Sequence, residues 1–329
     1  MGATSSTSCP SWNRKGACRG TLLLPDDADS YASTGTGDSC MSRKSRKEGQ
    51  PLCRWGGTGV LLAVLFSLCS MEAQAKTSCR KEVCVTPERM DGGRIVFFHA
   101  RNPYLFDVTI TIETTRLENM TSDVELPHTE VVPAGERRTI LRLFTTDIKQ
   151  RWRWNYRFSW RCGSMHAKHD DAVVYALPYA KGTSFLVIQG FNGKHSHFGP
   201  NQYAIDWAMP EGTPVHAARG GRVVGIRVTG SRNGPDQPSN YILILHDDGT
   251  VGGYYHLRKD GAAVTLGQVV EKGDLIGYSG NTGPSGRPHL HFFVFTAIDG
   301  YRQRSFPIRF RTKRYDSVIL EAGERYTAR

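Results

Sequence analysis

The amino-acid sequence predicts a mostly β protein, with a β-sandwich-like N-terminal domain followed by a second domain that is nearly all β. Three observations support this fold class. Short apolar segments recur between turn-forming clusters from residue 80 onward. Several of them alternate apolar and polar residues with the period of two that is typical of a half-buried strand. No amphipathic stretch of ordinary helical length interrupts the second half of the chain.

Length and composition set the outer limits of this prediction. The chain has 329 residues, of which 39% are hydrophobic and 10% aromatic. About 150 residues per domain is a usual prior, so we expect two domains with additional segments, and the hydrophobic content excludes a wholly disordered chain. The formal net charge of +11 indicates an anionic partner, which could be nucleic acid, acidic lipid or an acidic cell-wall polymer.

The first 75 residues have the composition of a leader rather than of a folded domain. Residues 1–40 are rich in Ser, Thr, Gly and Asp and show no sustained periodicity, so we expect them to be disordered. Residues 41–75 combine a basic stretch, a short apolar run and a final A-Q-A pattern, which is typical of a cleaved signal peptide. The apolar run is shorter than the roughly 20 residues that span a membrane.

The basic part of this signal peptide would be abnormally long if translation began at Met1. We therefore interpret Met41 as the native start and residues 1–40 as a start-site artefact. A retained membrane anchor and a lipid anchor at Cys69 are the alternatives. With a cleaved signal peptide, the protein would be periplasmic or secreted, without a stable membrane span.

An exported chain enters an oxidising compartment, where disulfides persist. Three cysteines follow the expected cleavage site, namely Cys79, Cys84 and Cys162. An odd number leaves one thiol unpaired. We expect Cys162 to pair with one of the other two, and the sequence leaves open which one.

Residues 76–180 read as short strands separated by turn clusters, as expected for the sandwich-like domain. The clearest strand is RWRWNYRFSWRC at residues 151–162, where aromatic residues and Cys162 occupy one face and arginines most of the other. This pattern predicts a half-buried antiparallel strand. Its arginine face is either a solvated surface or a basic stripe that docks an anionic polymer.

Residues 181–305 differ in sequence pattern from the preceding segment and form the second predicted domain. Apolar runs such as FLVIQG, GRVVGIRVTG and YILILH are separated by Gly-rich turns, and HDDGTVGG is typical of a hairpin turn after a buried strand. Residues 306–329 are basic and mixed, so we expect a closing strand and a basic tail there.

The strand PHLHFFVF at residues 288–295 places two histidines on one face, because side chains alternate along a strand. Leu290 and Phe292 point to the other face. A core gains nothing from unpaired imidazoles, since burial of an unsatisfied polar group costs free energy. An isolated H-x-H pair is nevertheless often incidental, so its meaning depends on the rest of the chain.

Other candidate ligands occur upstream of this strand. His195 and His197 lie in GKHSHFG, Asp206 lies in YAIDWAMP, and His256 ends GGYYH. A catalytic zinc site takes three protein ligands from His, Asp or Glu and leaves a fourth position to water. One His, one Asp and one member of the H-x-H pair would supply such a site, and two further histidines would remain to handle protons.

Four segments, in this order, closely resemble the lysostaphin/LytM-type zinc metallopeptidases of bacterial cell walls. They are SHFGPNQYAIDWAMPEGTPVHAARGGRVV, YILILHDDGTVGGYYHL, LGQVVEKGDLIGYSGNTG and RPHLHF, and together they cover roughly residues 185–300. The resemblance implies that residues 181–305 form an antiparallel β-sheet peptidase domain of the duplicated hybrid motif type. It also implies Zn²⁺ as the cofactor.

The same resemblance assigns roles to individual residues. It implies metal ligation by His197, Asp206 and His291, and catalytic roles without metal ligation for His256 and His289. Eight residues separate His197 from Asp206, more than is common in the family, which leaves His195 as an alternative ligand. Phe293 stands where many members carry an acidic residue.

We therefore expect a secreted or periplasmic zinc metalloendopeptidase that hydrolyses peptide bonds of peptidoglycan through a zinc-activated water. His289 would act as general base, and His256 would donate to the developing oxyanion. A nucleic-acid partner conflicts with the export signal and lacks a binding motif. The alternative hypothesis is a non-catalytic cell-wall-binding regulator of other murein hydrolases, although inactive relatives usually lose metal ligands and all five positions are filled here.

Overall fold

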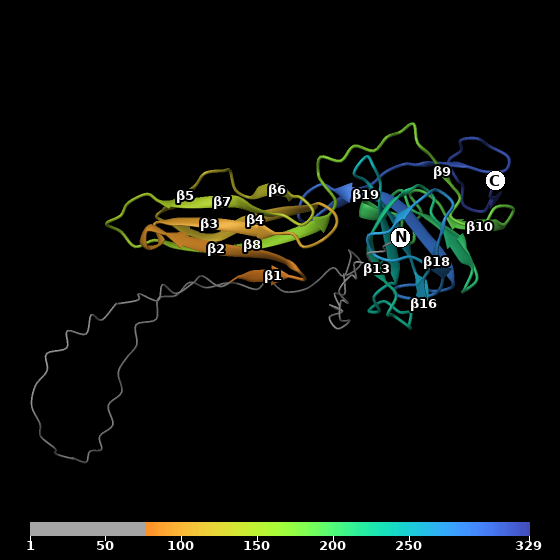
Figure 1. Cartoon of the computed structure of the whole chain (residues 1–329), viewed down its shortest axis with the longest axis horizontal. Helices are drawn as coiled ribbons and strands as arrows, with labels where there is room; N and C mark the ends of the chain where they lie inside the picture. The colour runs from red at the N-terminus through yellow and green to blue at the C-terminus, as the bar shows by residue number, and fades with distance from the viewer. Residues whose placement is uncertain (1–76) are drawn as a thin grey trace, which may run out of the picture.

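The computed structural model describes residues 77–329, and within that range the regular structure is almost entirely β-strand (Figure 1). The two helical segments in this range are single 3-10 turns, η1 (Asp91–Gly93) and η2 (Gly199–Asn201). Among the described residues, no helix is both long and apolar enough to cross a bilayer. The segments expected to be disordered and to form the signal peptide, 1–40 and 41–75, lie outside the described residues.

The N-terminal domain consists of two antiparallel sheets with a shared core, which confirms the predicted sandwich-like fold. The first sheet has the order β1 (Ser78–Arg80), β2 (Val83–Met90), β3 (Ile95–Arg101), β7 (Arg137–Thr145) and β5 (Met120–Ser122). The second has the order β6 (His128–Val132), β4 (Val108–Glu118) and β8 (Arg153–Cys162).

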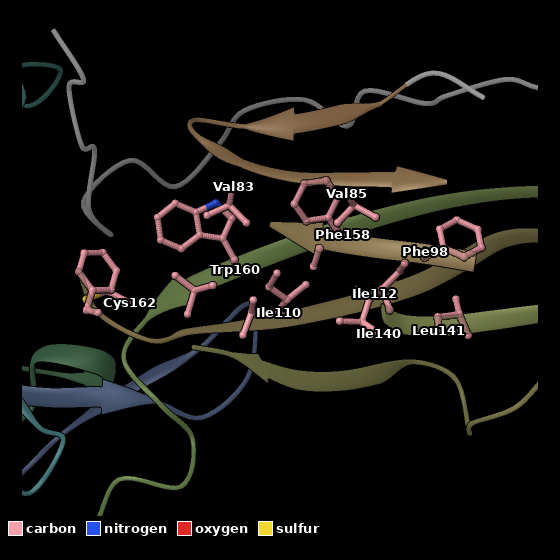
Figure 2. Close-up of a cluster of buried hydrophobic side chains, with 14 of the residues drawn as sticks. Val83, Val85, Phe98, Ile110, Ile112, Ile140, Leu141, Phe158, Trp160 and Cys162 are labelled. Atoms are coloured by element: carbon pink, nitrogen blue, oxygen red, sulfur yellow. The ribbon is translucent and has the colours of Figure 1, made fainter. Parts of the chain in front are cut away.

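Strand β8 shows the predicted alternation from residue 153 onward. Its aromatic side chains are buried, and Figure 2 shows Phe158 and Trp160 beside side chains of β2 in the core between the sheets. On the outer face, Arg153 and Arg157 form ion pairs with glutamates of neighbouring β4, at N···O distances of 3.6 and 2.8 Å. Two arginines of the expected basic stripe are therefore neutralised by partners within the sheet.

The expected disulfide of Cys162 is wrong. Cys79 and Cys84 form the disulfide because they are directly opposed partners in the β1–β2 pair. Cys162 is a free thiol, buried at the end of β8 (Figure 2). Burial raises the pKa of its thiol well above the ordinary value.

The second domain is built on a nine-stranded sheet. Eight of its strands follow the order β17 (Val269–Val270), β13 (Gly221–Arg227), β14 (Tyr241–Leu245), β15 (Val251–Tyr255), β19 (His289–Ala297), β11 (Ile205–Ala208), β10 (Ser184–Gln189) and β22 (Arg325–Thr327). The ninth, β20 (Gln303–Ser305), pairs with β19. All these pairings are antiparallel.

Two smaller sheets complete the domain. One contains β12 (Pro214–His216), β18 (Leu275–Ser279) and β16 (Leu257–Ala262). The other pairs β21 (Arg309–Arg311) with β9 (Val174–Ala176) in parallel. The C-terminal residues 306–329 thus contain two strands, β21 and β22, and both pair with strands that precede residue 190.

The two faces of β19 have different partners. Leu290, Phe292 and Val294 lie in the core of the second domain. The histidine-bearing face continues into Phe293 and Phe295, which belong to the same buried cluster as the core of the N-terminal domain. One hydrophobic core therefore extends across both domains, on the sheet face that carries the histidines.

Hydrogen bonds reinforce this domain contact. Thr296 Oγ1 donates to the carbonyl of Ser164 at 2.7 Å, and the Gly300 backbone N–H donates to Thr111 Oγ1 at 2.8 Å. Gly163 lies at this contact with a φ of +98°, and a Cβ atom added there would lie 3.0 Å from Thr296 Oγ1. The N-terminal domain is therefore packed directly against the strand that bears the histidine pair.

We predict that Phe295→Ala destabilises the whole protein by about 3–5 kcal/mol, because it removes a fully buried ring from the core shared by the two domains. Urea unfolding followed by far-ultraviolet circular dichroism measures this loss. Ile148→Ala is the control, since Ile148 is 63% exposed and its truncation should change stability little. A loss below about 1 kcal/mol for Phe295→Ala would contradict a shared core.

Candidate metal centre

Three of the residues singled out from the sequence come together on one side of the large sheet. His197, Asp206 and His291 each offer a ligand atom, and these atoms lie within 4.8 Å of one another. His197 Nε2 is 3.1 Å from Asp206 Oδ2, and His291 Nδ1 is 2.7 Å from Asp206 Oδ1. All three residues are buried. His195, the alternative ligand, is exposed and lies outside this cluster.

Strand register places two of the three ligands. Asp206 of β11 and His291 of β19 are directly opposed partners, so their side chains share one face of the sheet. Gln189 of β10 is the partner of Asp206 on one side, and Tyr255 of β15 is the partner of His291 on the other. A single row across four strands therefore holds the carboxylate and one imidazole side by side.

The third candidate ligand, His197, comes from the loop between β10 and β11. Its backbone N–H donates to the Gly193 carbonyl at 3.0 Å, and its ring Nδ1–H donates to the Gly190 carbonyl at 2.8 Å. A neutral imidazole with its proton on Nδ1 has a lone pair on Nε2. That Nε2 atom is buried and has no hydrogen-bond partner among the described residues.

This donor set fits a zinc ion. Two imidazole nitrogens and a carboxylate are ligands that zinc takes in catalytic sites. A lone pair on His197 Nε2 that faces a carboxylate oxygen at 3.1 Å is unfavourable unless a cation lies between them. Burial alone would raise the pKa of Asp206, but its interactions, foremost with the charge of His291, outweigh burial and hold this pKa below its usual range. Asp206 is therefore anionic and could serve as a metal ligand.

Gln189 holds this carboxylate in place. Its Nε2 donates to Asp206 Oδ2 at 3.1 Å and to Ser196 Oγ at 2.8 Å, and its Oε1 accepts from the His195 backbone N–H at 3.0 Å. It thus ties β11 to the loop that carries His197. Sequence reasoning did not single out Gln189, although a polar residue at the end of the apolar strand FLVIQ was a usable signal.

His256 reaches the site through an unusual backbone conformation. It follows β15 directly and has a φ of +62°, in the left-handed region that few non-glycine residues adopt. The turn ends the strand alternation and brings the His256 ring to 4.5 Å from that of His289, centroid to centroid. Its Nδ1–H donates to the Thr282 carbonyl at 2.7 Å. Burial, with the neighbouring histidines, lowers the pKa of His256 to about 3.

His289 is held in the same manner by the loop that precedes β19. Its Nδ1–H donates to the Arg287 carbonyl at 2.8 Å, and Ser285 Oγ lies 3.1 Å from the same nitrogen. Its Nε2 is 4.0 Å from Asp206 Oδ1. Because backbone carbonyls accept from the Nδ1–H of both His256 and His289, each neutral ring has its lone pair on Nε2.

These groups line an open cleft of about 570 Å³. Its wall contains four of the five residues expected from the sequence, Asp206, His256, His289 and His291, whereas His197 is buried and is not part of the wall. The end of β10, the loop that follows it and residues 284–287 also line the cleft. The cleft is large enough to receive part of an extended peptide.

Residues 200–302 match the sequence profile of the family described as Peptidase family M23. Peptidoglycan DD-endopeptidase ShyA from Vibrio cholerae is 34% identical over 135 residues, which cover 40% of this chain and 30% of ShyA. Glycyl-glycine endopeptidase ALE-1 from Staphylococcus capitis is 40% identical over 95 residues, covering 29% of this chain and 24% of the relative. The chain thus spans less than a third of the length of these curated relatives.

Lysostaphin from Staphylococcus simulans is 34% identical over 131 residues, which cover 38% of this chain and 23% of lysostaphin. The solved catalytic domain of lysostaphin aligns with 26% identity and a TM-score of 0.27, covering 37% of this chain and 87% of that domain.

We predict that Gln189→Ala weakens metal binding by about 10- to 100-fold, because Asp206 loses a hydrogen bond that orients its carboxylate. Competition with a zinc-binding dye measures the affinity. Gln150→Ala is the matched control, since Gln150 is an exposed glutamine of the N-terminal domain. Unchanged affinity in Gln189→Ala would show that Asp206 needs no such support.

Proposed function

We propose that this protein is a zinc metalloendopeptidase that hydrolyses peptide bonds of peptidoglycan, since residues 200–302 match Peptidase family M23. The observation that carries this proposal is the buried cluster of His197, Asp206 and His291, with two further histidines beside it in an open cleft. The names of the relatives support the substrate class, since they are a peptidoglycan DD-endopeptidase and a glycyl-glycine endopeptidase. The leader-like segment 41–75 supports a periplasmic or secreted location.

In this proposal, a zinc ion would be held by His197, the Asp206 carboxylate and His291. When bound there, zinc supplies a Lewis acid for the scissile carbonyl and lowers the pKa of a coordinated water. Asp206 also offsets part of the positive charge of the site, because it is anionic. Gln189 donates to Oδ2 of that carboxylate and so supports its position beside the two imidazoles.

His289 is the general base of the proposed reaction. Its Nε2 lone pair faces the cleft because its Nδ1–H is engaged by the Arg287 carbonyl. It accepts the proton of the attacking water and later returns it to the leaving amine. Among the two histidines, His256 is the weaker base, since burial and its neighbours lower its pKa to about 3.

We propose for His256 a role other than the oxyanion donor expected from the sequence. Donation to an oxyanion requires a proton on Nε2, whereas the Thr282 carbonyl accepts from Nδ1–H and leaves Nε2 as an acceptor. We assign His256 to accepting a hydrogen bond from the attacking water, which orients it toward the carbonyl carbon. The non-catalytic regulator considered from the sequence has no observation in its favour, because every residue of the proposed site is present.

We predict that the purified protein carries about one zinc ion per chain and releases soluble peptide-containing fragments from cell-wall sacculi. A strong chelator should abolish release, and added zinc should restore it, because the three ligands need no refolding to rebind the metal. Elemental analysis and chromatography of the fragments provide the two measurements. A well-folded, zinc-replete protein that releases nothing from sacculi would refute the proposed activity.

We predict that His289→Ala retains zinc but lowers the rate of hydrolysis by about 10²- to 10⁴-fold, because it removes the general base and leaves the three ligands intact. His291→Ala should lose both zinc and activity, since His291 is a ligand. Zinc content and initial rates, measured on the same preparations, separate the two outcomes. Loss of zinc in His289→Ala would instead identify the first histidine of the pair as the ligand.

A further inference from the structure

The charge on the cleft wall is uneven. Among the described residues that line the cleft, the only carboxylate is that of Asp206, which is already engaged by His197 and His291. Among the described side chains of this wall, Arg287 alone carries a permanent positive charge. A peptide that enters the cleft therefore meets the Arg287 guanidinium and, among the described side chains, no carboxylate other than that of Asp206.

The backbone carbonyl of Arg287 is held by hydrogen bonds, whereas its guanidinium has no partner among the described residues. Its carbonyl accepts from His289 Nδ1 at 2.8 Å and from Ser285 Oγ at 2.9 Å. The following residue, Pro288, restricts the backbone of Arg287 to extended conformations. The residue is exposed, and within residues 77–329 its guanidinium forms no hydrogen bond or ion pair. Two exposed arginines of β8 differ in this respect, since Arg153 and Arg157 both pair with glutamates.

Arg287 also lies next to the proposed general base. Its carbonyl accepts from His289 Nδ1–H at 2.8 Å, and both residues line the cleft. A group bound by this guanidinium would lie beside the bond that His289 helps to break.

We propose that the Arg287 guanidinium binds a carboxylate of the substrate beside the scissile bond, so that the cleft selects acidic peptides over uncharged ones. This inference rests on the proposed function and specifies its substrate class. A guanidinium matches the geometry of a carboxylate and can donate two parallel hydrogen bonds to it. Because the backbone of Arg287 is already fixed by His289 and Ser285, less order has to be imposed when the peptide binds.

The test compares two forms of one substrate. A cross-linked peptide dimer is isolated from peptidoglycan with its carboxylates free, and a second sample is converted to carboxamides. The values of kcat/KM for both dimers are measured with the wild-type protein, Arg287→Gln, Arg287→Lys and the control Arg314→Gln, whose arginine is exposed and lies outside the cleft.

We expect the wild-type protein to favour the free dimer by about 10-fold or more in kcat/KM. Arg287→Gln should remove this preference by slowing cleavage of the free dimer alone, with zinc content and cleavage of the carboxamide dimer unchanged. Arg287→Lys should keep part of the preference, and Arg314→Gln all of it. Equal kcat/KM for both dimers in the wild type, or equal slowing of both by Arg287→Gln, overturns the proposal.

A binding measurement separates this proposal from the proposed activity. Fluorescence anisotropy of the labelled dimers is recorded with His289→Ala and with the double variant that also carries Arg287→Gln. Tighter binding of the free dimer that disappears in the double variant supports the carboxylate site even if the wild type cleaves neither dimer, a result that would refute only the activity. Equal binding of the two dimers, or binding of neither, overturns the carboxylate site.

Discussion

The site depends on one register, that of β11 against β19, in which Asp206 faces His291. A slip of one residue would move either side chain to the opposite face of the sheet and separate the carboxylate from the imidazole. The apolar sides of the same strands specify this register. Trp207 of β11 and Phe292 of β19 are fully buried in the domain core, and burial of each such ring contributes about 1.5–3 kcal/mol. The same pairing of β11 with β19 therefore determines both the core packing and the positions of Asp206 and His291.

The same kind of hydrogen bond, from ring Nδ1–H to a backbone carbonyl, orients three of the imidazole rings. The Nδ1–H groups of His197, His256 and His289 each donate to a backbone carbonyl, at 2.8, 2.7 and 2.8 Å. Backbone carbonyls in tight loops move less than flexible side chains, so this arrangement holds both the ring orientation and the position of its proton. All three Nε2 atoms consequently retain lone pairs.

The sequence predicted the fold class well, because a period of two over segments such as residues 153–162 has few other structural explanations. The five site positions came from a resemblance between four ordered segments, and the structure brings them together. The proton positions of the site histidines and the pairing of the cysteines could not be predicted from the sequence. The proton position on His256 depends on the Thr282 carbonyl, 26 residues away in the sequence, and the disulfide depends on which cysteines are opposed in a hairpin.

The contact between the domains was not predictable from periodicity either. Phe293, which occupies a position where the resembling family often has an acidic residue, stacks on Tyr255 with ring centroids 5.4 Å apart. Both rings belong to the core that continues into the N-terminal domain. A carboxylate at position 293 would be buried there without a partner, which is costly. The departure at this position is thus explained by the domain that covers it.

The pairing of β10 with β22 has a consequence for the order of events during synthesis. These strands are separated by about 140 residues, and Gly182 and Thr183 also exchange hydrogen bonds with Ala328. The outer edge of β10 stays without its partner until the polypeptide has been made to that point, and contacts so distant in sequence form slowly. A nascent chain would therefore contain His197, Asp206 and His291 before β22 joins the edge of the sheet that positions them. During that interval the open edge of β10 would be a template for pairing with another chain.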